Sequence, residues 1–219
     1  MFGFIGLQAL PDITFDAGFH ISDTKLGDFQ NQIEEKIFSS NNINLSEFQS
    51  KYGVVNTKSR LGWHLGTSIK FKVNPLFYVS TGIGVTQKGF VAVQGFKVQD
   101  KNNLSQLISN FGESNKNIDF DFTYFEVPLL ANIILPLPFS PSVYSGVVAG
   151  YLVDQNQNGY DLSKSEVSGR IGASIKLSIL PLPFMPKYDL AFMHQFALTG
   201  VDEDSKSNMT SIQIKLNFL

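Results

Sequence analysis

The sequence has no cysteine, few charged residues and no long apolar run. Without Cys it can form neither a disulfide framework nor a thiolate metal site. Charged residues make up 16% of the 219 positions, below the roughly 25% of a typical soluble domain. No apolar run reaches the ~18 residues of a transmembrane helix. A net charge of −2 gives no reason to expect a nucleic-acid partner, and no metal cluster, phosphate loop or nucleotide motif is present.

Strict alternation of apolar and polar residues is the main positive signal. In 61–73 the odd positions are apolar or Thr, from Leu61 to Val73, and the even positions are Gly, His, Ser or Lys. The Asn74-Pro75 turn follows, and 77–89 alternates again. Both segments exceed the usual 5–6 residues of soluble strands and match the ~9–11 residues that a tilted strand needs to cross a bilayer.

The same pattern predicts eight strands in a single domain, residues 1–219. The expected strands are 13–22, 61–73, 77–89, 118–135, 143–153, 167–179, 188–200 and 210–218. In 118–135 the apolar phase shifts by one residue near Tyr124, which predicts a β-bulge, and Pro128 predicts irregular pairing. Aromatic residues near strand ends could form interfacial girdles: Trp63, Phe77, Tyr124, Phe139, Tyr151, Phe184 and Tyr188.

Long and short connections alternate along the chain. The long ones are 23–60, 91–117, 154–166 and 201–208, and the short ones are 74–75, 136–142 and 180–187. Apolar residues recur at helical spacing in 23–60 and 91–117, which predicts short helices there. We therefore expect an all-β fold: an eight-stranded antiparallel up-and-down transmembrane β-barrel with short helices in its long external loops.

Alternation alone would also fit a soluble barrel with an apolar interior. Three features favour lipid on the outside: polar faces rich in Gly and Ser, apolar faces without charge on four strands, and the asymmetric connections. The expected location is therefore the bacterial outer membrane, with its lipid as one partner. Residues 1–12 lack the positive region of a signal peptide, so we expect the sequence to be that of a mature or modified chain.

Several short motifs resemble the PorT-type outer-membrane barrels of Bacteroidota. The segment 124–130, Tyr-Phe-Glu-Val-Pro-Leu-Leu, resembles that family's fourth strand, and Gln87-Lys88-Gly89 resembles the end of its third. Gly146–Tyr151 and 17–22 are also similar, although His20 replaces the usual Asn, and the chain ends Phe218-Leu219 rather than on the aromatic residue. The resemblance implies a barrel without assigned activity, with one branch accessory to type IX secretion.

The alternation directs a set of polar and charged side chains into the lumen. An eight-stranded barrel is just wide enough for its side chains to fill, so these charges must pair. Glu126 with Arg170 is the expected central pair. The expected lumen network is a salt-bridge structure rather than a proton or ion path, and comprises Asp16, His64, Lys70, Lys88, Glu126, Arg170, Lys176 and Lys215.

Two histidines suggest other roles. His20-x-Ser22 resembles the base and nucleophile of lipid A deacylases, but no acidic partner is evident and both side chains should face the lumen. His194 lies on the otherwise apolar face of 188–200, where it could contact a partner protein or simply lie near the interface.

These observations favour a non-enzymatic barrel without cofactor or metal. We expect an accessory subunit of an envelope machine for protein secretion or outer-membrane protein assembly, bound to other outer-membrane or periplasmic proteins. The alternatives are a lipid-modifying enzyme and a stand-alone adhesion or membrane-stability barrel.

Overall fold

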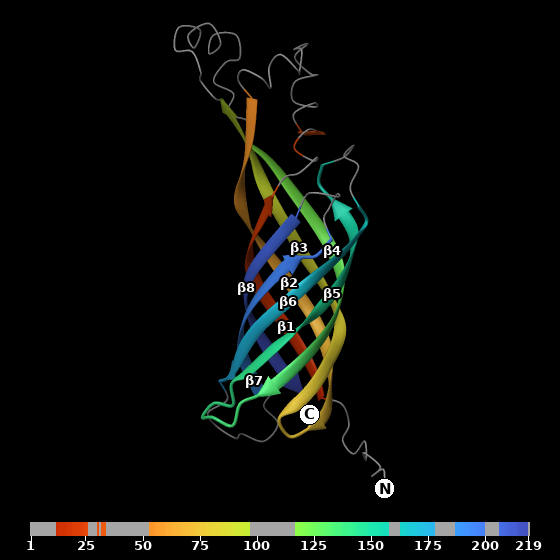
Figure 1. Ribbon diagram of the computed structural model, residues 1–219, viewed down its shortest axis with the longest axis vertical. Coiled ribbons are helices and arrows are strands. Elements are labelled where there is room, and N and C mark those ends of the chain that lie inside the picture. Colours follow the sequence, from red (N-terminus) through yellow and green to blue (C-terminus); the bar gives the residue numbers. More distant parts are fainter. Residues whose placement is uncertain are drawn as a thin grey trace, which may run out of the picture.

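The structure is a computed structural model that describes residues 12–25, 30, 32–33, 53–96, 117–157, 163–177, 187–199 and 206–218. Eight antiparallel strands follow one another around a closed barrel. The strands are β1 (Asp12–Lys25), β2 (Gly53–Asn74), β3 (Phe77–Phe96), β4 (Asn117–Ile134), β5 (Ser142–Gln155), β6 (Ser165–Lys176), β7 (Lys187–Ala197) and β8 (Lys206–Phe218). The barrel closes where β1 pairs with β8 (Figure 1), which confirms the expected fold.

The outer surface of the barrel is apolar and the lumen is polar. Ile69, Ile175 and Ile214 point outward with exposed fractions of 37%, 40% and 53%. On the opposite face, buried polar side chains such as His64, Ser80, Glu126, Ser168 and Gln213 fill the interior. This arrangement suits hydrocarbon outside, because a closed sheet satisfies every backbone group without water.

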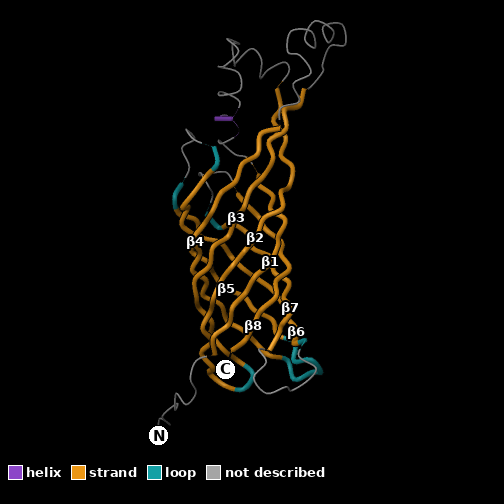
Figure 2. Tube along the Cα trace, turned by 180° about the vertical axis from the view of Figure 1, so that it is seen from behind, coloured by secondary structure: helices purple, strands orange, loops and turns teal. Residues whose placement is uncertain are grey.

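β2 and β3 are longer than the sequence predicts and, together with β4, rise above the other strands (Figures 1 and 2). β1 ends at Lys25 and β2 begins at Gly53, so part of the expected loop 23–60 is strand; β3 likewise runs on to Phe96, inside the expected loop 91–117. The apolar-outside pattern stops at the edge of the bilayer, although the backbone ladder continues beyond it. Gln30, Gln32 and Ile33 are helical, and the rest of the expected helices lies outside the described residues.

Side-chain polarity inverts in this extension. Phe120 and Phe122 point inward, on the same side as Glu126, whereas Asp119 and Asp121 point outward and pair with Arg60 at 2.8–2.9 Å. The apolar phase shift near Tyr124 therefore marks the level at which the strand leaves lipid, not a change in which side chains face inward. A register shift does occur between Thr123 and Tyr124 against β5, so the predicted irregularity is confirmed at that site.

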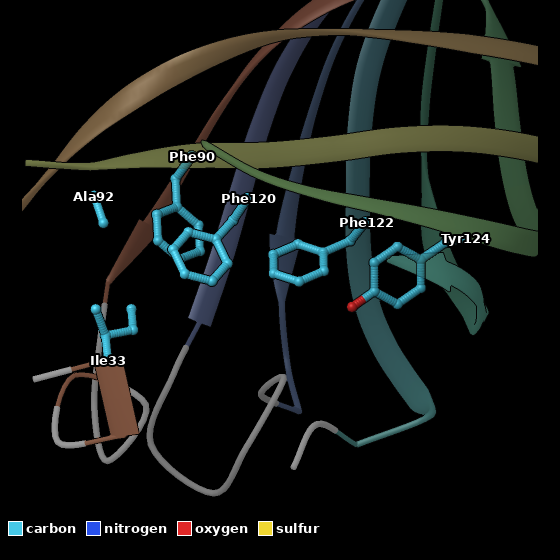
Figure 3. Packing of buried hydrophobic residues seen from close by; sticks show 6 residues of the cluster. All are labelled: Ile33, Phe90, Ala92, Phe120, Phe122 and Tyr124. Carbon is cyan, nitrogen blue, oxygen red and sulfur yellow. The ribbon is translucent and has the colours of Figure 1, made fainter. Parts of the chain in front are cut away.

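An apolar cluster fills the mouth of the barrel at the base of the extension. It consists of Ile33, Phe90, Ala92, Phe120, Phe122 and Tyr124 (Figure 3). The rings of Phe90 and Phe120 stack with centroids 4.8 Å apart. Tyr124, expected in an interfacial girdle, is only 1% exposed and belongs to this cluster, so that expectation was wrong.

Pro128 interrupts the β3–β4 ladder as predicted. Pairs are present at Thr81–Leu129 and Gly84–Glu126, but none is formed between them. Proline has no N–H to donate, and the Thr81 hydroxyl donates instead to the Pro128 carbonyl at 2.8 Å. The other side of the strand remains regular, with Pro128 opposite Val148 of β5.

The two described turns lie at the opposite end from the extension. Asn74 closes the β2–β3 turn, because its Oδ1 accepts the N–H groups of Leu76 and Phe77, each at 2.9 Å. The β4–β5 turn spans 135–141. Short turns face the periplasm in outer-membrane barrels, so we refer to this side as the periplasmic end. No helix in the part of the chain that the structure describes is long and apolar enough to cross a membrane.

Candidate functional site: the polar network of the lumen

A continuous set of hydrogen bonds crosses the lumen directly beside the apolar cluster, on the side of the periplasmic end. Its centre is the Glu126 carboxylate, which is 1% exposed. Lys88 Nζ lies 3.1 Å from Glu126 Oε1, and Arg170 Nη2 lies 2.7 Å from Glu126 Oε2. Two cations from β3 and β6 therefore share one carboxylate from β4, and this ties three strands together through the interior.

Gln195 and Glu166 complete the cation side of the network. Gln195 Oε1 accepts from Arg170 Nε and Nη2 at 2.9 and 2.6 Å, and its Nε2 donates to Glu126 Oε1 at 2.9 Å. Lys88 also donates to Glu166 Oε1 at 2.9 Å. A buried charge is tolerated only when it is paired and hydrogen-bonded. Lys88, Arg170 and Glu126 meet that condition, and Glu166 meets it through Oε1 alone, because its Oε2 has no hydrogen-bond partner among the described residues.

Asp16, His64 and Thr86 extend the network to β1 and β2. His64 Nε2 lies 2.6 Å from Asp16 Oδ2, and Nδ1 lies 2.7 Å from Thr86 Oγ1. Thr86 has one hydroxyl hydrogen, which it donates to Glu126 Oε2 at 2.9 Å. The Thr86 hydroxyl therefore accepts from Nδ1 of His64, and the ring links Asp16 to Thr86 and, through Thr86, to Glu126.

The charged groups of this network are paired. Glu126 and Glu166 contact Lys88 and Arg170, and Asp16 contacts the His64 ring. Such a network consolidates a lumen, because no member can be removed without leaving a partner charge buried. The cavity beside it measures only about 40 Å³, close to the ~30 Å³ share of one liquid water.

Glycines make room for the large side chains of the lumen. A Cβ on Gly62 would lie 2.3 Å from His20 Nε2 and 2.1 Å from the Gln87 carbonyl oxygen. A Cβ on Gly84 would lie 3.0 Å from His64 Cε1. The Gly-rich polar faces of the sequence are thus the spaces into which the histidine rings pack.

The structure brings together five of the eight side chains expected in the network: Asp16, His64, Lys88, Glu126 and Arg170. The other three lie elsewhere. Lys215 Nζ lies over the Tyr144 ring, 4.3 Å from its centroid, and Lys70 donates to Asn217 at 2.5 Å. Lys176 is exposed at the periplasmic end.

Sequence reasoning missed four members of the network: Thr86, Glu166, Ser168 and Gln195. Thr86, Ser168 and Gln195 share the inward phase of their strands, so the alternation could have identified them had neutral side chains been counted. Glu166 lies one residue before the expected start of its strand, and β6 begins at Ser165.

The surroundings of His20 and Ser22 do not match a catalytic pair. Both side chains are buried toward the lumen, at 2% and 0% exposure. The Ser22 hydroxyl donates to the Gly89 carbonyl at 2.6 Å and accepts the Gly89 N–H at 3.0 Å. Its role here is to join β1 to β3. Among the described residues, no group of three or more potential metal ligands is present.

His194 points outward. Its Nδ1 lies 3.0 Å from Thr210 Oγ1 of β8, and its ring lies 6.3 Å from that of Phe196. Its neighbours on the outer face include Phe192 and Ile171, which are 52% and 48% exposed. An ionisable side chain thus lies within the apolar outer surface, and one of its ring nitrogens is hydrogen-bonded to the neighbouring strand β8.

The model of the family described as outer membrane protein beta-barrel domain matches residues 11–201. No curated protein matches the chain. Among solved structures, Ail of Yersinia pestis is 16% identical with a TM-score of 0.44, covering 95% of this chain and 99% of Ail. Neisserial surface protein A is 12% identical with a TM-score of 0.45, covering 95% of this chain and 97% of that protein. OprG of Pseudomonas aeruginosa is 13% identical with a TM-score of 0.39, covering 95% of this chain and 96% of OprG.

Proposed function

Because the chain belongs to the outer membrane protein beta-barrel domain family, it is a barrel of the bacterial outer membrane, and we propose that it is a non-enzymatic accessory subunit of an envelope machine. The machine would carry out protein secretion, such as type IX secretion, or outer-membrane protein assembly. Its partners would be other outer-membrane or periplasmic proteins.

The filled lumen is the observation that carries this proposal. A water-filled passage is what a porin needs, but the paired network of Glu126, Lys88 and Arg170 occupies the interior beside a cavity of about 40 Å³. A barrel whose lumen is filled in this way would act through its outer surface and its two ends. That is how a structural or accessory subunit works.

The PorT-type resemblance supports the same proposal, because its motifs meet in space. Lys88 of the third-strand motif pairs with Glu126 of the fourth-strand motif and lies 4.8 Å from the Tyr124 ring centroid. A Cβ on Gly150 of the fifth-strand motif would lie 3.5 Å from the same ring. These short similarities thus describe one physical unit of the lumen.

His194 supports a partner on the lipid-facing side. It lies in the lining of an apolar hollow of about 1310 Å³, together with Phe19, Ile171 and Ile212. An ionisable residue facing hydrocarbon is unfavourable and is often functional. A transmembrane segment of a partner could fill the hollow and hydrogen-bond the ring.

Purification from native membrane in mild detergent tests the proposal. We expect other envelope proteins to co-purify in stoichiometric amounts with the wild type. His194→Leu should reduce their recovery severalfold, whereas the control variant Val127→Leu, on the outer surface away from the hollow, should retain them. If the wild-type barrel purified alone, the accessory role would be wrong; equal recovery with His194→Leu would exclude only the contact at His194.

A further inference from the structure

A separate cavity, larger than the one beside the lumen network, opens at the periplasmic end of the barrel. It measures about 160 Å³, and we call it the periplasmic pocket. Its lining includes Lys70, Ser142, Ser174, Lys176, Lys187 and Asp189. Ser142, Ser174 and Asp189 are buried on the inner wall of the barrel, so the pocket lies within the ring of strands.

The pocket carries an excess of positive charge. Lys72 Nζ lies 2.9 Å from Asp12 Oδ2, and these two charges neutralise each other. Lys176 and Lys187 form no ion pair with any residue that the structure describes. Lys70 donates only to the neutral Asn217 side chain. Three ammonium groups thus face one remaining carboxylate, that of Asp189.

Asp189 is the unusual member of this set. It is 6% exposed, and its Oδ1 is buried without a hydrogen-bond partner among the described residues. Its cross-strand neighbours are Lys176 and Lys215. Neither lysine nitrogen comes within 4 Å of the Asp189 carboxylate, so neither forms an ion pair with it. An unsatisfied buried carboxylate oxygen is unfavourable, so this atom is available to a donor on a ligand.

The turn beside the pocket is backbone-strained and carries exposed apolar side chains. Phe139 and Ser140 have φ angles of 65° and 41°, in the left-handed region that non-glycine residues rarely adopt. Ser140 lines the pocket. Leu137 and Phe139 are 57% and 64% exposed. Such strain is found where a segment must present particular groups, here an apolar surface next to a basic pocket.

These features indicate what chemistry the pocket can accept. A lipid headgroup would lie outside the barrel wall and could not reach inward-facing groups. The volume corresponds to about five water molecules at ~30 Å³ each, which is enough for a small terminal group. Lysine ammonium groups suit an anion, and a free carboxylate oxygen suits an N–H donor close to that anion.

We propose that the periplasmic pocket binds the free carboxyl terminus of a polypeptide. The terminal carboxylate would accept from Lys176 and Lys187, and a backbone N–H of the peptide would donate to Asp189 Oδ1. Side chains preceding the terminus would pack on Leu137 and Phe139. Capture of a terminal carboxylate is an established mode of peptide recognition. This inference deepens the proposed accessory role, and rests on it, by naming the kind of partner that binds at the periplasmic end.

Isothermal titration calorimetry on the full-length barrel in detergent tests the site directly. The probes are acetyl-Ala-Ala-Ala as the free acid, the same tripeptide as its carboxamide, acetate and inorganic phosphate. We expect the free acid to bind roughly tenfold more tightly than the carboxamide, because the charge-assisted bonds are lost. Lys176→Gln combined with Lys187→Gln should abolish this preference, and the exposed Lys164→Gln should leave it unchanged.

The contribution of Asp189 is separable from that of the lysines. Asp189→Ala should lower the affinity for the free-acid peptide toward that for acetate, which has no backbone N–H, while acetate binding persists. Equal binding of free acid and carboxamide, or no binding of either, would overturn the proposal. So would acetate or phosphate binding as tightly as the peptide. These measurements need no co-purifying protein, so failure here and failure of the accessory role are distinguishable.

Discussion

At the scale of single residues, Glu126 is the centre of the lumen network, because its carboxylate contacts the most partners. It is the only carboxylate among the described residues that contacts both Lys88 and Arg170. Its side chain also accepts from Thr86 and Gln195. Removing one partner of a buried ion pair is far more harmful than replacing the whole pair, since the remaining charge keeps its desolvation cost.

We predict that Glu126→Gln lowers the free energy of unfolding by about 3–5 kcal/mol, because the buried Arg170 loses its carboxylate partner and Lys88 keeps only Glu166. Urea unfolding of the barrel refolded into lipid vesicles measures this change. The control is Asp119→Asn, whose side chain is 55% exposed and pairs with Arg60; a pair so exposed contributes about 0–1 kcal/mol. A loss of under 1 kcal/mol for Glu126→Gln would mean that the network does not stabilise the barrel.

At the scale of elements, the extension of β2, β3 and β4 depends on its own apolar cluster. The membrane-spanning part is held by the closed ladder and by lipid outside, but above the bilayer no lipid covers the strands. There the apolar side chains turn inward, and Phe90, Phe120 and Phe122 pack on Ile33 (Figure 3). The extension therefore has a small core of its own, which meets the lumen network where Lys88 lies over the Tyr124 ring.

Phe120→Ala should destabilise this extension locally. A buried Phe→Ala change costs about 3–5 kcal/mol, and local opening can occur without global unfolding. We expect faster hydrogen exchange of the backbone amides in 88–93 and 117–123, with little change in 62–72. Leu129→Ala, on the lipid-facing side of the same strand, is the control and should not affect the extension. A uniform increase in exchange over the whole barrel would show that the cluster is part of one cooperative unit.

At the scale of the whole molecule, the two ends of the barrel differ in construction and should face different compartments. The extended parts of β2, β3 and β4 lie at one end, while the turns 75–76 and 135–141, the start of β1 and the end of β8 lie at the other (Figure 1). In outer-membrane barrels the short turns are periplasmic. The periplasmic pocket would then be closed to the cell exterior.

The absence of Cys from the sequence allows this orientation to be tested by single-cysteine labelling. Ser163→Cys, in the connection between β5 and β6 at the end opposite the turn 135–141, should react with a membrane-impermeant maleimide on intact cells. Leu137→Cys, on the exposed β4–β5 turn, should react only after the outer membrane is permeabilised. The reverse labelling pattern would invert the orientation and would place the pocket at the cell surface.

Much of the barrel was predictable from the sequence because a period of two residues specifies both the strand and its two faces. The alternation in 61–73 and 77–89, with the Asn74-Pro75 break, identified β2 and β3 as a hairpin, and the inward phase placed Glu126 and Arg170 on facing sides of a narrow lumen. The start of β2 and the end of β3 were not predictable by the same rule, because both strands run on well past the predicted bounds. Outside lipid, the apolar side chains change sides while the strand continues.

What the sequence determined by itself is therefore the repeating contrast between apolar and polar neighbours, since that contrast is local and depends only on strand geometry. Only the tertiary structure decided which polar groups meet. Lys88 and Glu166 are 78 positions apart and bond at 2.9 Å, whereas Asp189 and Lys176 are cross-strand neighbours and form no ion pair. Contacts across a lumen depend on the registers and tilts of all eight strands together, and no local pattern contains that information.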